Sequence, residues 1–348
     1  MQAKPKISVI TASKNGGRFL RETLDSILVQ NFTNYEHVFV DSVSTDNTLE
    51  ILEEYKRKGY DRIRWISEPD RHADEGFYKA LMMSQGEYIM FCCVSDGYLD
   101  KDWFGKCVDV LDNNPDVSLV YGMPLNIREN GMPRKIVFSK FADQLPPQKM
   151  EFFPFWLGTF FVYPEGTYCV RANVYKKCFP KFEPSGCFLQ NHGVFSFNYN
   201  FNVNGYLPYF LPVIASFGRS HHDSNNRNLI DLNSAMKNQY FAAIKKYHEE
   251  VLSGKRKHIF RDGSSNEIEA IGPYELKLDS KKILDYSINR EAYLRSEKIR
   301  GLRYQKRIPR ILVSLFTKKK SNTEYNDWFV RYHEIKNNSK KTSSAKRI

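Results

Sequence analysis

Short apolar runs alternate with amphipathic stretches along the first 122 residues. Residues 7–11 (ISVIT) and 37–41 (HVFVD) are compact and rich in β-branched residues, which predicts two strands. Between them, residues 17–30 repeat apolar side chains at helical spacing, which predicts an amphipathic helix. The same patterns predict further strands at 62–68, 88–94 and 117–122, and helices at 44–59, 75–84 and 101–112.

This alternation predicts an α/β fold with a Rossmann-like, mostly parallel central sheet and helices on both faces. Ligands of such sheets lie at the carboxyl ends of the strands. The segments expected there are polar, acidic and glycine-containing: residues 11–15, 41–44, 68–70 and 95–97. Asp46, in the stretch STDNT, is expected to cap the following helix rather than to bind a ligand.

The regular alternation ends near residue 122. Aromatic side chains gather between Phe152 and Phe217, where they form either a groove or ordinary core. Residues 229–295 mix helical and loop patterns, which predicts a C-terminal helical extension. The last part, 296–348, is a basic tail whose end has the composition of a disordered segment.

The net charge of +12 belongs almost entirely to this tail, which carries 15 Lys and Arg against 4 Asp and Glu. A neutral body with a basic tail favours an anionic membrane surface as the partner, and we expect no nucleic acid. Apolar residues at helical spacing between 308 and 316, bordered by cations, fit a helix lying on such a surface. Docking of this helix on the protein's own core remains the alternative.

Six cysteines show neither a CxxC pair nor metal-ligand spacing. The sequence enters a strand almost at once, and its longest apolar run, FFPFWLGTFFVYP, contains proline and glycine. We therefore expect a cytoplasmic protein that is peripheral on the inner face of the plasma membrane.

The acids near the predicted strand ends suit a nucleotide ligand. Carboxylates accept hydrogen bonds from a base or a ribose, and they approach a diphosphate through a bridging cation such as Mn²⁺ or Mg²⁺. The loop after the first strand, ASKNGG, has neither of the usual glycine motifs that cradle phosphates, GxGxxG and GxxxxGK(S/T).

The run ISVITASKNGGRFLRETLDSILVQNFTNYEHVFVDSVSTDNT (7–48) resembles the opening of family-2 glycosyltransferases of the GT-A fold. ISEPD (66–70), GEYIMF (86–91) and SDGYL (95–99) resemble the next landmarks of that family. The resemblance implies inverting, metal-assisted transfer of a sugar from a nucleotide-diphosphate sugar, UDP-linked in the first instance, to a glycan or lipid-linked acceptor. It also implies a role in cell-surface polysaccharide synthesis, such as capsule, lipooligosaccharide or O-antigen.

On this resemblance, residues 1–122 are the nucleotide-sugar-binding half of the domain and residues 123–228 the acceptor-binding half. The residues implied to bind the nucleotide are Thr11, Ala12, Ser13, Asn15, Asp41, Ser44 and Asp70. Those implied to border the donor sugar are Arg71, His72, Asp74, Glu75 and Ser95. Arg71 to Glu75 belong to a loop longer than the family's, and a solvated surface loop is the alternative.

The implied metal ligands are Asp96, His221 and His222. The triplet Val94, Ser95, Asp96 lacks the first acid of the family's DxD motif, so one carboxylate is left. A purely structural role for the two histidines stays open.

An inverting transferase needs a general base for the acceptor hydroxyl. The segment where the family carries it, residues 187–206, contains no carboxylate here. We expect the base to be His192 or Glu165, with Glu183 and Asp223 as nearby alternatives. The missing acids also leave open a catalytically impaired module that binds a nucleotide-sugar without transfer. The oligomeric state is not predicted.

Overall fold

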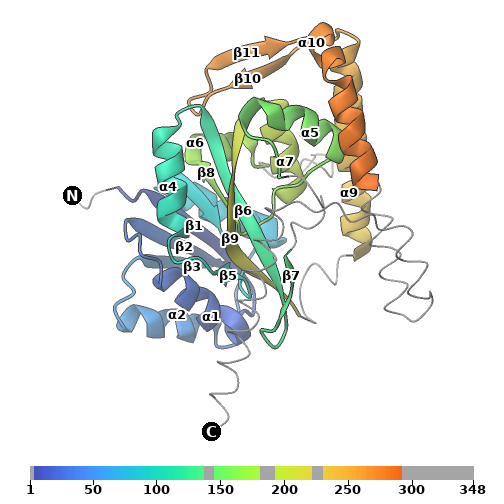
Figure 1. Cartoon of the computed structure of the whole chain (residues 1–348). Helices are drawn as coiled ribbons and strands as arrows, with labels where there is room; N and C mark the ends of the chain where they lie inside the picture. The colour runs from blue at the N-terminus through green and yellow to red at the C-terminus, as the bar shows by residue number, and fades with distance from the viewer. Residues whose placement is uncertain (1–3, 137–144, 181–192, 222–229, 292–348) are drawn as a thin grey trace.

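A computed structural model describes residues 4–136, 145–180, 193–221 and 230–291 (Figure 1). The first part follows the predicted alternation: β1 (Ile7–Ser13), α1 (Gly17–Leu28), β2 (Tyr35–Asp41), α2 (Thr48–Arg57), β3 (Ile63–Ser67), α3 (Ala73–Met83), β4 (Tyr88–Phe91), β5 (Gly97–Tyr98) and α4 (Trp103–Asn113). The second part contains β6 (Val117–Arg128), β7 (Pro133–Ile136), the short helix η2 (Lys149–Glu151), α5 (Phe152–Thr159), β8 (Tyr168–Arg171), α6 (Ala172–Cys178), α7 (Gly193–Val203) and β9 (Leu207–Ser220). An extension follows, with α9 (Ile230–Leu252), β10 (His258–Arg261), β11 (Glu267–Ile271), α10 (Pro273–Leu278) and a last helix at 280–291.

Within the described residues, nine strands form one sheet in the order β3-β2-β1-β4-β8-β6-β9-β5, with β7 beside β6. β3, β2, β1 and β4 are parallel, which confirms the α/β prediction. β8 runs antiparallel to both β4 and β6, so it separates β6 from the first parallel set. The sequence did not reveal β8, because four residues, YCVR, are too few to show a period.

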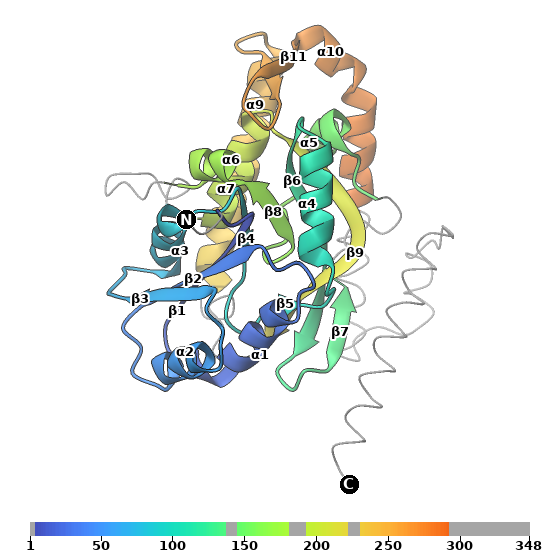
Figure 2. The same ribbon diagram turned by 90° about the vertical axis from the view of Figure 1, so that its left-hand side faces the viewer.

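Each face of the parallel strands carries its own core, because successive side chains point to opposite faces. On one face, Ile10 and Val38 join a core formed with α3, α5, α6, α7 and α9. On the other face, Val9 and Phe39 pack with residues of α1, α2 and α4. Figures 1 and 2 place α1 and α2 at one end of the molecule and the β10–β11 hairpin at the other.

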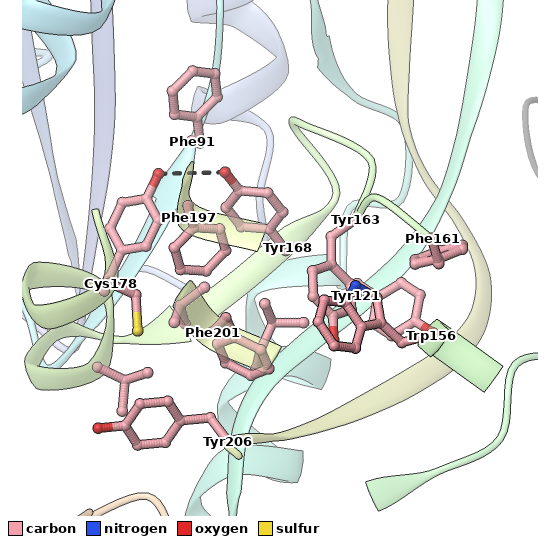
Figure 3. Packing of buried hydrophobic residues seen from close by; sticks show 14 of the residues in the cluster. Phe91, Tyr121, Trp156, Phe161, Tyr163, Tyr168, Cys178, Phe197, Phe201 and Tyr206 are labelled. Atoms are coloured by element: carbon pink, nitrogen blue, oxygen red, sulfur yellow. Dashed lines mark hydrogen bonds between the residues drawn. The ribbon is translucent and has the colours of Figure 1, made fainter. Parts of the chain in front are cut away.

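The aromatic segment of the second part is core. Tyr121, Trp156, Tyr163 and Phe197 are fully buried, and Figure 3 shows them packed between the sheet and the helices. The hydroxyls of Tyr168 and Tyr175 meet at 3.3 Å within this layer. Of the two interpretations of the aromatic cluster, packing is therefore confirmed for these rings.

The predicted C-terminal helical extension is confirmed, with an antiparallel hairpin inserted in it. It packs closely on the aromatic layer, and two contacts show this. Trp156 Nε1 donates to the hydroxyl of Tyr240 on α9 (2.9 Å). A Cβ on Gly158 would lie 2.5 Å from the carbonyl oxygen of Ile283, so only glycine allows the last helix to approach α5 this closely.

Candidate functional site

The carboxyl ends of the parallel strands meet at one edge of the sheet, as expected. Ser13 at the end of β1 is in register with Asp41 of β2, which is in turn in register with Ser67 of β3. Thr11 of β1 is fully buried, and its hydroxyl lies 2.9 Å from Nε2 of His37. This edge therefore brings together several of the residues predicted to bind a nucleotide.

Asp41 is fully buried and already accepts three hydrogen bonds. Ser44 donates from its backbone N–H (2.9 Å) to Oδ2 and from its hydroxyl (2.5 Å) to Oδ1, and the hydroxyl of Ser67 (2.6 Å) donates to Oδ2. The carboxylate thus ties the loop after β2 to the end of β3. One acceptor position on Oδ1 remains for a ligand.

The loops after β1 and β2 are bonded to each other. The backbone N–H of Asn15 donates to Ser44 Oγ (2.7 Å), and Asn15 Oδ1 accepts from the backbone N–H of Thr45 (2.8 Å). Asn15 and Val43 adopt left-handed φ angles of 53° and 51°. Such a conformation is strained for a β-branched residue, so these contacts hold Val43 against its preference.

Asp46 binds the first turns of two helices. Its carboxylate accepts from the backbone N–H of Gly17 at the start of α1 (2.9 Å) and of Thr48 at the start of α2 (3.0 Å). Burial opposes ionisation of Asp46, but these bonds and that of the Thr48 hydroxyl outweigh it and lower its pKa. Asp46 therefore bonds the amino ends of helices, as expected of a capping residue, although the N-cap position of α2 itself is Asn47. The helix predicted at 44–59 consequently begins only at Thr48.

The segment predicted to border the donor sugar is largely helical, since α3 begins at Ala73. Arg71 and His72 precede it and are exposed, whereas Asp74 and Glu75 lie in its first turn and are partly buried. Glu75 accepts from the backbone N–H (2.7 Å) and Nε (3.0 Å) of Arg71. The ion pair with Arg71 lowers the pKa of Glu75.

α3 packs directly on the predicted nucleotide loops. A Cβ on Gly76 would lie 2.9 Å from the Cβ of Ala12 and 2.9 Å from Asp70 Oδ2. Asp70 Oδ1 also accepts from the hydroxyl of Ser42 (2.9 Å). Ala12 and Asp70, distant in the sequence, are therefore neighbours under the first turn of α3.

Asp96 follows β4 in a tight turn, in which Ser95 has a left-handed φ of 84°. The Asp96 carboxylate accepts from the backbone N–H of Arg219, near the end of β9 (3.0 Å). Burial raises the pKa of Asp96 to about 7, although this hydrogen bond and the charge of Arg219 oppose the rise. Positive charge from a ligand would favour the ionised carboxylate.

Arg219 is a site residue that the sequence analysis missed. Its side chain is only 3% exposed and forms an ion pair with Glu22 of α1. Its guanidinium also donates to the carbonyl of Glu129 (2.8 Å) and lies 5.0 Å from the ring centre of Phe19. The sequence offered one signal for Arg219, its position in the polar segment FGRSHHDSNN (217–226). In that segment the adjacent histidines were predicted as metal ligands, and Arg219 was given no role.

Glu165 lies in a turn that is closed by a bond from the N–H of Thr167 to the carbonyl of Pro164 (3.3 Å). Gly166 in this turn has a φ of 74°, which favours glycine. A Cβ on Gly166 would lie 3.9 Å from the carbonyl oxygen of Phe91, the last residue of β4. The turn therefore lies beside the end of the central strand.

Three carboxyl groups interact electrostatically at this place. Burial raises the pKa of Glu165 to about 8, and the negative charges of Asp74 and Asp96 add to the rise. Burial raises the pKa of the partly exposed Cys93 thiol, and the charges of the same three carboxyl groups add to the rise. The structure thus brings together three residues that the sequence assigned to base, sugar and metal.

The predicted histidines are only partly described. The ring of His221 lies 4.9 Å from that of Phe19, centre to centre. His192, His222, Glu183 and Asp223 lie outside the described residues. Their assignment as base or ligand stays a prediction.

Comparison with known proteins identifies one domain of the chain. Residues 8–173 match the family model Glycosyl transferase family 2. These residues form a family 2 glycosyl transferase domain. The match spans the whole parallel half of the sheet, the Asp96 turn and the Glu165 turn.

Two curated relatives illustrate the similarity. The chain is 31% identical over 134 residues to poly(ribitol-phosphate) beta-N-acetylglucosaminyltransferase TarS of Staphylococcus aureus, covering 38% of this chain and 23% of that protein. It is 30% identical over 163 residues to poly(ribitol-phosphate) beta-glucosyltransferase of Bacillus spizizenii, covering 42% of this chain and 25% of that protein. The chain thus spans about a quarter of the length of these relatives.

Solved structures show the same fold. A crystal structure of S. aureus TarS 1-349 in complex with UDP-GlcNAc aligns with a TM-score of 0.50 at 17% identity, covering 82% of this chain and 72% of that one. Mannosyltransferase PcManGT from Pyrobaculum calidifontis, in complex with GDP-Man and Mn²⁺, aligns with a TM-score of 0.52 at 14% identity, covering 95% and 85%. The predicted GT-A fold is confirmed.

The family 2 domain has limited means of its own to bind a cation. In the part of the chain that the structure describes, no three His, Cys, Asp or Glu side chains converge as a metal site. Mg²⁺ and similar ions that bind with substrate phosphates need only one or two carboxylates, because waters and phosphate oxygens complete the shell. Asp96 fits the role of a single protein ligand.

No helix among the described residues is both long and apolar enough to cross a bilayer.

Proposed function

We propose that this chain transfers a sugar from a nucleotide-diphosphate sugar to a hydroxyl of a glycan or lipid-linked acceptor, with inversion and with help from a divalent cation. The observation that carries the proposal is the convergence of Asp96 and Glu165 beside the end of β4, within the family 2 domain. Paired carboxyls in a partly buried setting suit proton transfer and cation binding, whereas a purely structural sheet edge does not require them.

The nucleotide would lie over the loops after β1 and β2. The bonds between Asn15 and Ser44 hold these loops in one conformation before any ligand arrives. Asp41 keeps one acceptor position for a donor group of the base. We take a UDP-sugar as the first donor to test, since the TarS structure aligned here holds UDP-GlcNAc.

Asp96 would hold Mn²⁺ or Mg²⁺ against the donor diphosphate. A bound cation of this kind supplies positive charge to the departing diphosphate. Arg219 fixes the Asp96 carboxylate through its backbone N–H. The reaction needs a base for the acceptor hydroxyl, and Glu165 is the predicted candidate that the structure describes at this edge.

The acceptor would approach from the second half of the domain, residues 123–228. The relatives named above act on poly(ribitol-phosphate), and by analogy we place the product in bacterial cell-surface glycan synthesis. The basic tail, 296–348, lies outside the described residues. We propose that it binds an anionic membrane surface on the cytoplasmic side, where a lipid-linked acceptor would be reached.

The experiment is an assay of nucleoside diphosphate release and sugar transfer from a panel of nucleotide-sugars, with and without Mn²⁺. Transfer that requires the cation supports the proposal. The single acid of the Val94–Asp96 triplet favours a second candidate, a module that binds the donor without transfer. Tight donor binding with no release from any donor would support that candidate instead.

A further inference from the structure

The proposed reaction needs a base, and the acceptor-side helix α7 carries no carboxylate. An attacking hydroxyl must lose its proton as the new bond forms. Residues 187–206 contain no Asp or Glu, and the described part of that segment is α7. A carboxylate for this step must therefore come from another element.

Most described carboxylates at the sheet edge are already bonded to protein groups. Asp41 accepts from Ser44, and Asp70 accepts from Ser42. Asp96 accepts from Arg219, and Glu75 accepts from Arg71. No hydrogen bond from a described residue reaches the carboxyls of Asp74 or Glu165. These two groups are left for chemistry.

Asp74 lies where the two halves of the domain meet. Two residues after it, Gly76 packs against Ala12 and Asp70 of the predicted nucleotide loops. On the other side, a Cβ on Gly193 would lie 2.7 Å from Asp74 Oδ1. The carboxylate therefore contacts the first residue of α7 while its own helix contacts the donor loops. An acceptor hydroxyl that attacks a donor sugar must lie between these same two parts.

Asp74 lies at the amino ends of two helices. It lies in the first turn of α3 and against the first residue of α7, and the amino end of a helix carries partial positive charge. Its negative charge in turn contributes to the raised pKa of Glu165.

We infer that Asp74, and not the predicted candidate Glu165, is the catalytic base of the proposed transfer. This inference rests on the proposed function. The acceptor oxygen donates an electron pair to the anomeric carbon and a new C–O bond forms. The proton of that hydroxyl moves to Asp74, while the bond from carbon to the diphosphate oxygen breaks and its electron pair leaves with the diphosphate.

The inference is tested on the full chain with Asp74→Asn, Asp74→Glu and a control, Glu53→Gln, which removes an exposed charge on α2. UDP is the probe for donor binding, measured by calorimetry, and kcat is measured as a function of pH. Asp74→Asn should lower kcat by about 10²–10⁴-fold and abolish the acid limb of the pH profile, with UDP affinity unchanged. Asp74→Glu should keep part of the activity, because it keeps a carboxylate. Glu53→Gln should behave as the unmodified chain.

The inference is overturned if Asp74→Asn keeps the kcat of the unmodified chain, or if it loses UDP affinity in proportion to kcat. The second result would make Asp74 part of donor binding or of folding. An unmodified chain that neither binds UDP nor turns over any nucleotide-sugar would count against the proposed function itself. The two failures are therefore separable.

Discussion

The backbone N–H of Arg219 donates to the carboxylate of Asp96 at 3.0 Å, across 123 positions of the sequence. This bond joins the long strand β9 to the turn after β4. It leaves the other carboxylate oxygen for a ligand and fixes the direction in which the carboxylate points.

Replacement of Asp96 by Ala should abolish nucleotide-sugar turnover and its dependence on Mn²⁺. The reason is that Asp96 is the one acid of the Val94–Asp96 triplet and the proposed protein ligand of the cation. The measurement is nucleoside diphosphate release over a range of Mn²⁺ concentrations. Asp109→Asn, on the exposed side of α4, removes the same charge and should leave the rate unchanged. Cation-dependent turnover in the Asp96 variant would refute the assignment.

Replacement of Arg219 by Ala should lower the free energy of unfolding by about 1–3 kcal/mol, because the carbonyl of Glu129 would lose its buried donor. Arg219→Lys should restore little of the lost free energy of unfolding, because lysine lacks the planar guanidinium that donates to several acceptors at once. Chemical denaturation provides the measurement. The matched control is Arg18→Ala, whose ion pair with Glu129 is exposed and should be worth less than about 1 kcal/mol. Equal losses for the two variants would contradict the structural role given to Arg219.

The parallel half of the fold could be predicted from the sequence because its signals are local. Strands such as ISVIT and the capping residues around Asp46 carry their own periodicity and turn chemistry. The antiparallel β8 and the extension of β6 to Arg128 could not, because their pairing depends on contacts distant in the chain. A four-residue strand has no measurable period.

The site was predictable only in part, for the same reason. Asp96 and Asp41 follow recognisable strands, so their position at the edge could be expected. Arg219 and the contact of Asp74 with Gly193 depend on how β9 and α7 return to that edge. The sequence placed Asp74 in a loop, whereas it lies in the first turn of α3.

Two buried histidines should each destabilise the folded chain as the pH falls below 6.5. The raised pKa values of Asp96 and Glu165 act in the opposite direction over this range, so the contribution of a histidine is measured by its replacement. Burial lowers the pKa of His37 to about 3 in the folded state, and burial followed by the charge of Arg261 does the same for His258. The unfolded chain binds protons at these histidines below pH 6.5 while the folded chain does not, so stability is lost as pH falls. The loss should reach about 2 kcal/mol per histidine near pH 5.

Urea denaturation at a series of pH values measures this effect. His37→Gln cannot titrate at this position, so its stability relative to that of the unmodified chain should rise between pH 6.5 and pH 5. Parallel pH curves for the two proteins would show that His37 does not contribute.

Two glycine substitutions should differ in cost although both glycines have positive φ. A Cβ on Gly205 would lie 1.8 Å from the carbonyl oxygen of Ile259, so Gly205→Ala must separate α7 from β10. We expect a loss above about 4 kcal/mol. Gly59 has a φ of 92° but open space around it, so Gly59→Ala should cost only about 1–2 kcal/mol. Thermal unfolding distinguishes the two, and similar melting temperatures would contradict the packing of the hairpin.

The proposed transferase activity is tested most directly by one measurement: release of nucleoside diphosphate from a panel of nucleotide-sugars, UDP-sugars first, by the full chain with and without Mn²⁺. We predict Mn²⁺-dependent release from at least one donor, and no release by Asp96→Ala. Absence of both binding and release for every donor, by a chain that is folded, would contradict the proposal.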